Sequence, residues 1–542
     1  MKILYFSILS IAFVLSFLPA AISDDSHQDF VQCLILKSSS SISQVIYTPQ
    51  NSSYTSVLQF SINNLRFDTP STPKPIAIVK PVHESQIQTV IYCCKKHDIQ
   101  MRIRGGGHDF EGHSYIAQVP FVLLDMINLR SISVDPVKAT AWVQSGATLG
   151  ELYYSIAQKS NTLAFPAGVW TNVGVTGHIS GGGYGILRRK YGLAADNVLD
   201  ARLIDATGRI LDRKSMGEDL FWAIRGGGAS SFGVVLSWKL KLVYVPEFVT
   251  VFQVQRTLEQ NATEVLDRWQ TVSPKLPKDV EIRVVASTVW KYMPNEDRKT
   301  VQDVGSGKLR DNAKKTVSLT FVGSFLGRQQ GLLSLMKEKF PELGLVAQEC
   351  SEVSYIQSVL LFSLFSATDS PVGLLNRTRP SIAFKAKSGF VDKPISREGL
   401  DGLCKILVQA APGRTNFIFT SYGGKMDEIS ESATPFPHRA GTLYMMYMRV
   451  QTDGDTLSAM KWIRGLYEYL TPYATKSPRT AYLNYNDRDL GVNNNQDTSS
   501  YKQASIWGRK YFKNNFDRLV IVKSIVDPDN FFRHEQSIPP FS

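Results

Sequence analysis

The fold of this chain is decided by residues 102–109, which read RIRGGGHD. A strand predicted over residues 101–104 runs straight into three glycines, Gly105, Gly106 and Gly107, and His108 ends the loop. Consecutive glycines let backbone N–H groups form a concave anion site that a phosphate can approach closely. We therefore expect this loop to bind the phosphates of a ligand and to place His108 beside the group that they carry.

Two further glycine clusters repeat this feature, at residues 181–185 (GGGYG) and 226–229 (GGGA). A single cluster of this kind is usually a tight turn. Three of them, with apolar strands between, indicate a large cofactor that carries a pyrophosphate. The chain has neither the GxxxxGK[ST] motif of a P-loop nor a strand–GxGxxG–helix unit of Rossmann type.

Composition places the chain among folded, multi-domain proteins. It has 542 residues, of which 43% are hydrophobic and 20% are charged, so wholesale disorder is excluded. The 60 Lys and Arg against 48 Asp and Glu give a net charge of +12. The basic residues are scattered rather than clustered, so nucleic-acid binding is not expected.

The N-terminus predicts entry into the secretory pathway. Residues 1–23 combine a lysine, an apolar run and small residues, which is typical of a signal peptide. No other apolar run of about 20 residues occurs, so we expect no membrane anchor. Glycosylation sequons at Asn51, Asn261 and Asn376 agree with secretion, to the apoplast or the vacuole.

The five cysteines are odd in number and fit no metal site; they are Cys33, Cys93, Cys94, Cys350 and Cys404. In an oxidising compartment, one disulfide between the N-terminal segment and the region near residue 93 is expected. Cys350 and Cys404 are interpreted as buried small apolar residues.

Hydrophobic patterning divides the chain into two lobes and a tail. Expected strands cover residues 76–79, 101–104, 122–124, 140–144 and 249–252, and expected helices cover residues 84–97, 262–269 and 457–470. The domains that follow are residues 24–245, with a core from about residue 70, residues 246–478, and residues 479–542, which return to the first lobe.

Residues 104–115 resemble the flavin-attachment motif of the plant berberine bridge enzyme-like family. Further segments carry the same resemblance, namely residues 166–168, 173–185, 219–228, 515–519 and 526–532. Together they span nearly the whole mature chain. The resemblance implies an α+β, two-lobed flavoprotein of the vanillyl-alcohol-oxidase/PCMH type, in which helices back the antiparallel sheet of the substrate lobe. It also implies FAD, small plant phenolic substrates and a monomer.

The resemblance also implies which residues serve the cofactor. His108 would bond to the 8α carbon of the flavin, and a Cys33–Cys93 disulfide would follow. The full set of implied cofactor residues is Arg104, Gly105, Gly106, Gly107, His108, Ser114, Trp170, Val173, Gly174, Gly177, His178, Gly182, Gly183, Tyr511 and Asn515. Many relatives add a second flavin bond from a cysteine at position 170, but a tryptophan forms no thioether, so one link is expected. Val173 occupies the position that leaves room for dioxygen, and His178 is interpreted as a buried imidazole rather than a catalyst.

The strand predicted over residues 444–449 carries the second departure from the family. Side chains alternate along a strand, so Met445, Tyr447 and Arg449 share one face. By resemblance, position 447 faces the substrate and is commonly Glu or Gln. A neutral phenol is a poor base but a good hydrogen-bond donor. Arg449 has two interpretations. It either pairs with a carboxylate of the protein, or it acts as a donor that polarises a substrate carbonyl or holds a phenolate.

The candidate catalytic residues are therefore Tyr485, Tyr447 and Arg449, without a metal. Tyr485 matches the tyrosine that acts as base in several relatives, and its alternative is a packed aromatic residue. Two reactions compete: a redox-neutral [4+2] cycloaddition of a chalcone-type dienophile with a prenyl-derived diene, and oxidation of a plant phenolic or alkaloid by FAD with O2 giving H2O2. Met445, Met446, Met448 and Trp170 favour the first, because it needs apolar partners held in contact. A non-catalytic flavoprotein is the least favoured alternative.

Overall fold

The structure is a computed structural model that describes residues 18–38, 41–290, 315–378, 380–409, 413–493 and 500–541. Residues 1–17 of the expected signal peptide lie outside the described residues, and the first helix, α1, spans Leu18–Lys37. Strands and helices are mixed throughout, as the α+β prediction requires.

The first lobe begins with a four-stranded sheet in the order β1-β2-β4-β3. Its strands are β1 (Ile46–Tyr47), β2 (Ala77–Val79), β3 (Gln100–Arg104) and β4 (Phe121–Asp125), and helix α3 (Glu84–Lys96) connects β2 to β3. Strands β2, β4 and β3 run parallel. β3 is an edge strand of this sheet, and the glycine loop follows its last residue.

An antiparallel sheet of five strands completes the first lobe, in the order β5-β6-β10-β8-β9. Its strands are β5 (Ile132–Asp135), β6 (Thr140–Gln144), β8 (Val198–Ile204), β9 (Ile210–Leu211) and β10 (Val234–Lys241). Helices α4 (Leu149–Ala157), α5 (Val175–Ser180) and α7 (Arg213–Ile224) contribute to its hydrophobic core, and a short pair, β7 (Leu163–Ala164) with β11 (Val243–Tyr244), lies beside it.

The second lobe is a seven-stranded antiparallel sheet in the order β15-β12-β14-β13-β17-β18-β16. Its strands are β12 (Phe248–Thr257), β13 (Val280–Trp290), β14 (Lys315–Phe325), β15 (Cys350–Ser354), β16 (Phe384–Val391), β17 (Thr415–Ser421) and β18 (Tyr444–Gln451). Helices α8 (Ala262–Val272), α9 (Gln329–Lys339), α11 (Arg397–Val408) and α13 (Thr456–Tyr469) pack with one face of this sheet in a single core. The opposite face is therefore left for the first lobe and the site.

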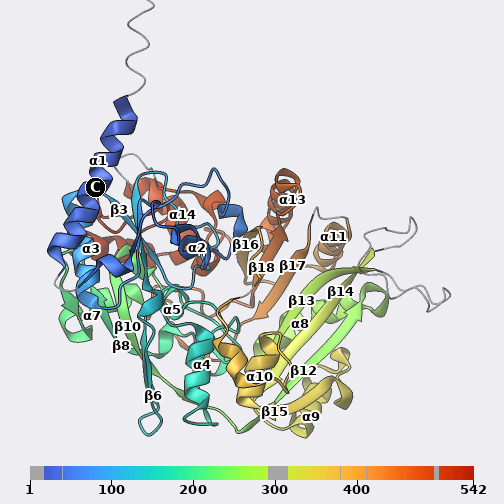
Figure 1. Cartoon of the computed structure of the whole chain (residues 1–542). Helices are drawn as coiled ribbons and strands as arrows, with labels where there is room; N and C mark the ends of the chain where they lie inside the picture. The colour runs from blue at the N-terminus through green and yellow to red at the C-terminus, as the bar shows by residue number, and fades with distance from the viewer. Residues whose placement is uncertain are drawn as a thin grey trace, which may run out of the picture.

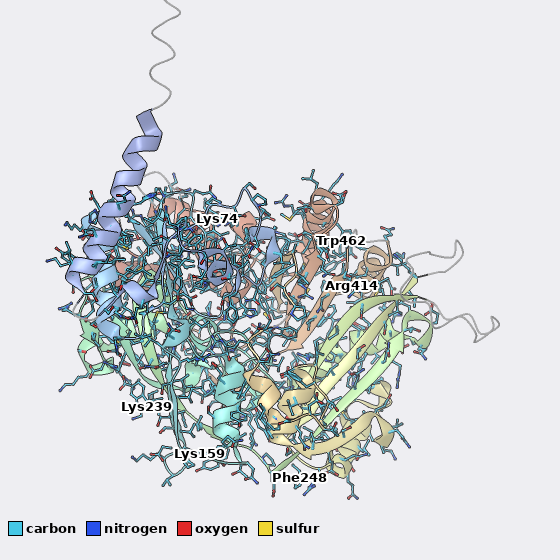
Figure 2. The ribbon with its side chains drawn as sticks, viewed as in Figure 1. Lys74, Lys159, Lys239, Phe248, Arg414 and Trp462 are labelled. Carbon is cyan, nitrogen blue, oxygen red and sulfur yellow. A yellow bond between two sulfur atoms is a disulfide. The ribbon has the colours of Figure 1, made fainter. Side chains whose placement is uncertain are left out.

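The tail contains two helices, α14 (Tyr501–Phe512) and α15 (Asn515–Val526). Buried residues of both share a hydrophobic core with the five-stranded sheet of the first lobe, and Figure 1 shows α14 lying among the first-lobe elements. Figure 2 draws the side chains on this ribbon and labels Trp462 on α13 of the second lobe and Lys239 on β10 of the first. The chain thus leaves the first lobe, builds the second and returns.

The structure confirms the disulfide between Cys33 and Cys93, a bond that persists in oxidising compartments. Cys404 is buried, as predicted, but the prediction for Cys350 is wrong, because this residue at the start of edge strand β15 is only partly buried. The three sequon asparagines are exposed. Among the described residues, no helix has the length and apolar character needed to cross a bilayer, and no group of three or more His, Cys, Asp or Glu side chains is placed to hold a metal ion.

Candidate active site

The glycine loop after β3 is pressed against a second backbone segment. A Cβ atom on Gly106 would lie 2.3 Å from the backbone nitrogen of Gly174. Gly107 has φ +69°, and a Cβ there would lie 1.7 Å from the carbonyl oxygen of Ser61. Only glycine fits at both positions, since larger residues would push the segments apart. The contact fixes His108 beside residues 172–174.

His108 has the properties that attachment to a cofactor requires. Its Nε2 atom is buried and has no hydrogen-bond partner among the described residues. Burial lowers the pKa of His108 to about 4, and hydrogen bonding to Asn172 offsets only part of this effect. The imidazole is therefore neutral at pH 7, so a ring nitrogen keeps a free lone pair. A buried polar atom without a partner, next to a glycine-lined backbone, fits a flavin dinucleotide.

The second glycine segment shapes the same region. Gly182 and Gly183 have φ values of +110° and +73°. The Gly183 N–H donates to the hydroxyl of Tyr482 over 3.0 Å, which ties the tail to this loop. His178 Nε2 accepts a hydrogen bond of 2.9 Å from the Gly168 N–H, and burial lowers the pKa of His178 to about 4. His178 is thus a satisfied neutral imidazole, and its contact with the cofactor stays a prediction.

Several other predicted cofactor residues have protein partners of their own. The buried guanidinium of Arg104 pairs with Asp125 at 2.7 Å and also donates to the backbone carbonyls of residues 57 and 58. The Tyr511 hydroxyl accepts from the Asp487 N–H at 2.9 Å, and the Asn515 amide donates to backbone carbonyls of residues 431–435. These side chains hold the architecture, so a cofactor contact from them stays a prediction. Contact with the cofactor also stays a prediction for the remaining residues of the set, which are Gly105, Ser114, Trp170, Val173 and Gly177.

An aromatic cluster, defined here as Phe110, Tyr184, Tyr447 and Tyr485, brings the two lobes and the tail together. The rings of Phe110 and Tyr485 stack with centroids 5.1 Å apart and planes 11° apart. The rings of Tyr447 and Tyr485 lie 4.6 Å apart, and the hydroxyls of Tyr184 and Tyr485 are hydrogen-bonded. The structure therefore places two of the three predicted catalytic residues in direct contact.

The tyrosines of the aromatic cluster are held in their neutral form. Burial, with the neighbouring Tyr184 and Tyr447, raises the pKa of Tyr485 well above its ordinary value. Burial also raises the pKa of Tyr447 to about 12, against a smaller lowering effect of Arg449. At pH 7 both phenols keep their protons, so both can donate hydrogen bonds and neither is a ready base.

Arg449 lies on the same sheet face as Tyr447 and stands without an acidic partner. No ion pair of the described residues includes Arg449, and its Nε atom is buried without an acceptor. The guanidinium lies 5.8 Å from the centre of the Phe384 ring. Of the two interpretations of Arg449, a carboxylate pair and a donor to the substrate, this geometry favours the donor.

The nearby carboxylates have hydrogen-bond or ion-pair partners of their own. Asp109 accepts hydrogen bonds from two backbone N–H groups and from the Asn486 amide. Glu111 and Asp487 both bind the buried ammonium of Lys385, and the distance from Asp487 to this ammonium is 2.5 Å. Glu111 and Asp487 are thus held in ion pairs, whereas burial raises the pKa of Asp109 above its ordinary value.

Comparison with known proteins identifies this arrangement. Residues 75–213 match a family model described as an FAD binding domain, and residues 481–539 match one described as berberine and berberine like. Tetrahydroberberine oxidase of Berberis wilsoniae is 48% identical over 544 residues, which cover 99% of this chain and 98% of that protein. The chain belongs to the berberine bridge enzyme-like family.

Two further matches agree with this assignment. Monolignol oxidoreductase AtBBE-like 13 of Arabidopsis thaliana is 46% identical over 535 residues, covering 97% of this chain and 96% of that protein. The solved structure of BBE-like #28 from Arabidopsis thaliana is 46% identical and superposes with a TM-score of 0.86, covering 95% of this chain and all of that one. The chain is thus an FAD-dependent oxidoreductase of the berberine bridge enzyme-like family, and its fold is that of the family.

One sequence argument about the pocket of this berberine bridge enzyme-like chain is wrong. Met446 and Met448, expected to line the pocket, point to the opposite face of β18, into the core beneath the helices. They pair with β16 and β17 at positions that alternate with Met445 and Tyr447. Only Met445 lies on the pocket side, packed with Tyr482 and Phe436. Period-two alternation, applied to the methionines as it was to Tyr447, predicts this.

Sequence reasoning also missed several residues of the site. Phe110 and Tyr184 lie inside the motifs that carried the family resemblance, but no role was assigned to them. Arg283 on β13 has a buried Nε atom without a partner and lies 5.3 Å from the ring of Phe362. Asn416 on β17 has a buried Oδ1 atom without a donor. No local pattern marks Arg283 or Asn416, because their positions depend on strand pairing.

Proposed function

We propose that this family member uses its pocket for a redox-neutral [4+2] cycloaddition between a chalcone-type dienophile and a prenyl-derived diene. The observation that carries the proposal is the buried Nε atom of Arg449, which has no acceptor among the described residues, beside the neutral phenol of Tyr447. Two such donors on one face of a strand suit a substrate carbonyl, and donation to an enone lowers the energy of its empty orbital.

Cycloaddition needs no proton acceptor, which agrees with the groups present. Two carbon–carbon bonds form, three π bonds become one, and no atom or electron leaves the pair of reactants. Tyr447 and Arg449 would hold the carbonyl, while the rings of Phe110 and Tyr485 would keep the diene in contact with it. Holding two reactants in contact distance is itself a large part of such a rate enhancement.

The cofactor belongs to the proposal as well. Residues 105–107 and 174 would hold the FAD backbone, and His108 would be its single covalent anchor, since Trp170 offers no sulfur. When bound, FAD supplies a ring system that can accept a hydride. We further propose that the chain acts after secretion, in the apoplast or the vacuole, as a monomer.

Oxidation of a plant phenolic or alkaloid with O2 is the second candidate. It is favoured by the hydrogen bond between the Tyr184 and Tyr485 hydroxyls, which could pass a substrate proton, and by the names of the two curated relatives, an oxidase and an oxidoreductase. Val173, at the position that leaves room for dioxygen, fits this candidate too.

One experiment separates the two candidates. The flavin-loaded protein is incubated without oxygen with a chalcone and a prenyl-derived diene, and the flavin absorption band and the product mass are followed together. Cycloaddition predicts a product mass equal to the sum of both reactants and an unchanged flavin band. A product lighter by two hydrogens with a bleached flavin band establishes the oxidase instead.

A further inference from the structure

Asn416 and Arg449 occupy directly opposite positions on two paired strands. Asn416 of β17 is the registered partner of Arg449 of β18, as Ile418 is of Tyr447 two residues along. Side chains at paired positions project to the same face, with Cβ atoms about 5 Å apart. Ile418 packs with Tyr447 and Phe110, so this is the face that carries the aromatic cluster.

The two side chains present complementary atoms that do not satisfy each other. The Asn416 Oδ1 atom is a buried acceptor without a donor, and the Arg449 Nε atom is a buried donor without an acceptor, within the part of the chain that is described. A buried polar atom that stays unpaired is costly, and such atoms in native proteins are rare. A ligand that carries one hydrogen-bond donor and one acceptor at matching positions could satisfy both the Asn416 Oδ1 atom and the Arg449 Nε atom.

An aromatic ring and a small side chain flank Arg449. The Phe384 ring lies 5.8 Å from the guanidinium carbon of Arg449, and Ala386 of β16 is the registered neighbour of Arg449 on its other side. A planar guanidinium beside an aromatic ring keeps its orientation. Ala386 is buried and packs with Phe384 and Tyr447, on the same face as the aromatic cluster.

We infer that Asn416 and Arg449 form a recognition subsite for a carbonyl with a neighbouring hydroxyl, as in an ortho-hydroxyaryl ketone. The Arg449 guanidinium donates to the carbonyl oxygen, and the Asn416 carbonyl accepts from the hydroxyl. This inference rests on the proposed function in one respect only: it names the class of the dienophile that the same pocket takes. Asn416 becomes a specificity-determining residue, which the family resemblance alone did not single out.

The test measures binding, so that it does not depend on turnover. Dissociation constants of the flavin-loaded protein are obtained, from perturbation of the flavin band, for 2′-hydroxychalcone and for chalcone without that hydroxyl. The wild type is expected to bind the hydroxylated ketone about 10-fold or more tightly, because the analogue leaves the Asn416 acceptor unpaired. Asn416→Leu is expected to bind both ketones alike. Thr415→Val, on the same strand but the opposite face, is the matched control and keeps the preference.

Each result has a separate meaning. Equal binding of both ketones by the wild type, or an undiminished preference in Asn416→Leu, overturns the subsite. If the preference is present and abolished in Asn416→Leu while no adduct ever forms with a diene, the subsite stands and the proposed cycloaddition fails. If adducts form without any preference, the cycloaddition stands and the subsite fails.

Discussion

Replacing Lys385 by methionine is the sharpest test of how the site is assembled. The Lys385 side chain is 1% exposed, and its ammonium binds Glu111 and Asp487, whose side chains are 4% and 2% exposed. Glu111 follows the loop of His108 and Phe110, and Asp487 lies two residues beyond Tyr485. One lysine on β16 therefore joins the cofactor loop, the substrate sheet and the tail.

The expected cost follows from the charges left behind. Breaking a buried ion pair by removing one partner costs about 3–5 kcal/mol, because the other charge stays buried. In the variant, Glu111 keeps its ion pair with Arg66, and Asp487 keeps its ion pair with Lys387 at 2.7 Å. The expected loss in the free energy of unfolding therefore lies near the lower limit, about 3 kcal/mol. For a lobe of this size, that corresponds to a fall in Tm of about 6–12 °C.

The assay is thermal unfolding followed by tryptophan fluorescence, with turnover measured at a temperature where the variant stays folded. Lys461→Met removes an exposed lysine on α13 that has no ion pair among the described residues, and its Tm should change by less than about 2 °C. Lys385→Met should also lower kcat more than it raises KM, because the Tyr485 segment loses its anchor. A Tm within 2 °C of the wild type would refute the account of this network.

Three further predictions concern the cofactor loop, the disulfide and the buried histidines. Gly106→Ala should abolish flavin loading, because the new Cβ would lie 2.3 Å from the Gly174 nitrogen. The control Gly465→Ala should load flavin normally, because no atom lies within 4 Å of its new Cβ. Equal flavin absorbance of the two purified variants would contradict this prediction. Cys33→Ser opens a bridge between residues 60 positions apart and should cost about 2–5 kcal/mol, seen as a lower Tm; an unchanged Tm counts against a structural role. Burial lowers the pKa of His178 to about 4, so between pH 6.5 and 4 the unfolded chain binds more protons than the folded chain. As the pH falls through this range, the free energy of unfolding should therefore decrease by about 1.4 kcal/mol per pH unit. In His178→Phe the free energy of unfolding should depend less steeply on pH, and an equal dependence in the variant and the wild type would disprove the prediction.

Much of the first lobe could be predicted from sequence, because its signals are local. The strand over residues 140–144 and the helix from residue 84 agree with β6 and α3 to within one residue. Alternation along β18 correctly grouped Tyr447 with Arg449. These features depend on neighbours in the chain, which is the range over which periodicity carries information.

The parts that were missed depend on contacts between distant segments. Helices α14 and α15 lie in a tail whose aromatic and Gly/Asn-rich composition hides their periodicity, and they form because they cover the core of the first lobe. The Lys385–Asp487 pair joins residues 102 positions apart, and the pairing of Asn416 with Arg449 is set by the register of β17 and β18. No local sequence pattern predicts either pair.

The central claim is that donors, and no base, drive the reaction in this pocket. Its most direct test compares adduct formation by Arg449→Met and Tyr485→Phe on one chalcone and diene pair, with flavin content matched. The account predicts that Arg449→Met loses about 100-fold or more in rate, the usual effect of removing one polarising donor, while Tyr485→Phe, which keeps the ring, stays within about 5-fold. Loss of the reaction in Tyr485→Phe with little change in Arg449→Met would contradict it.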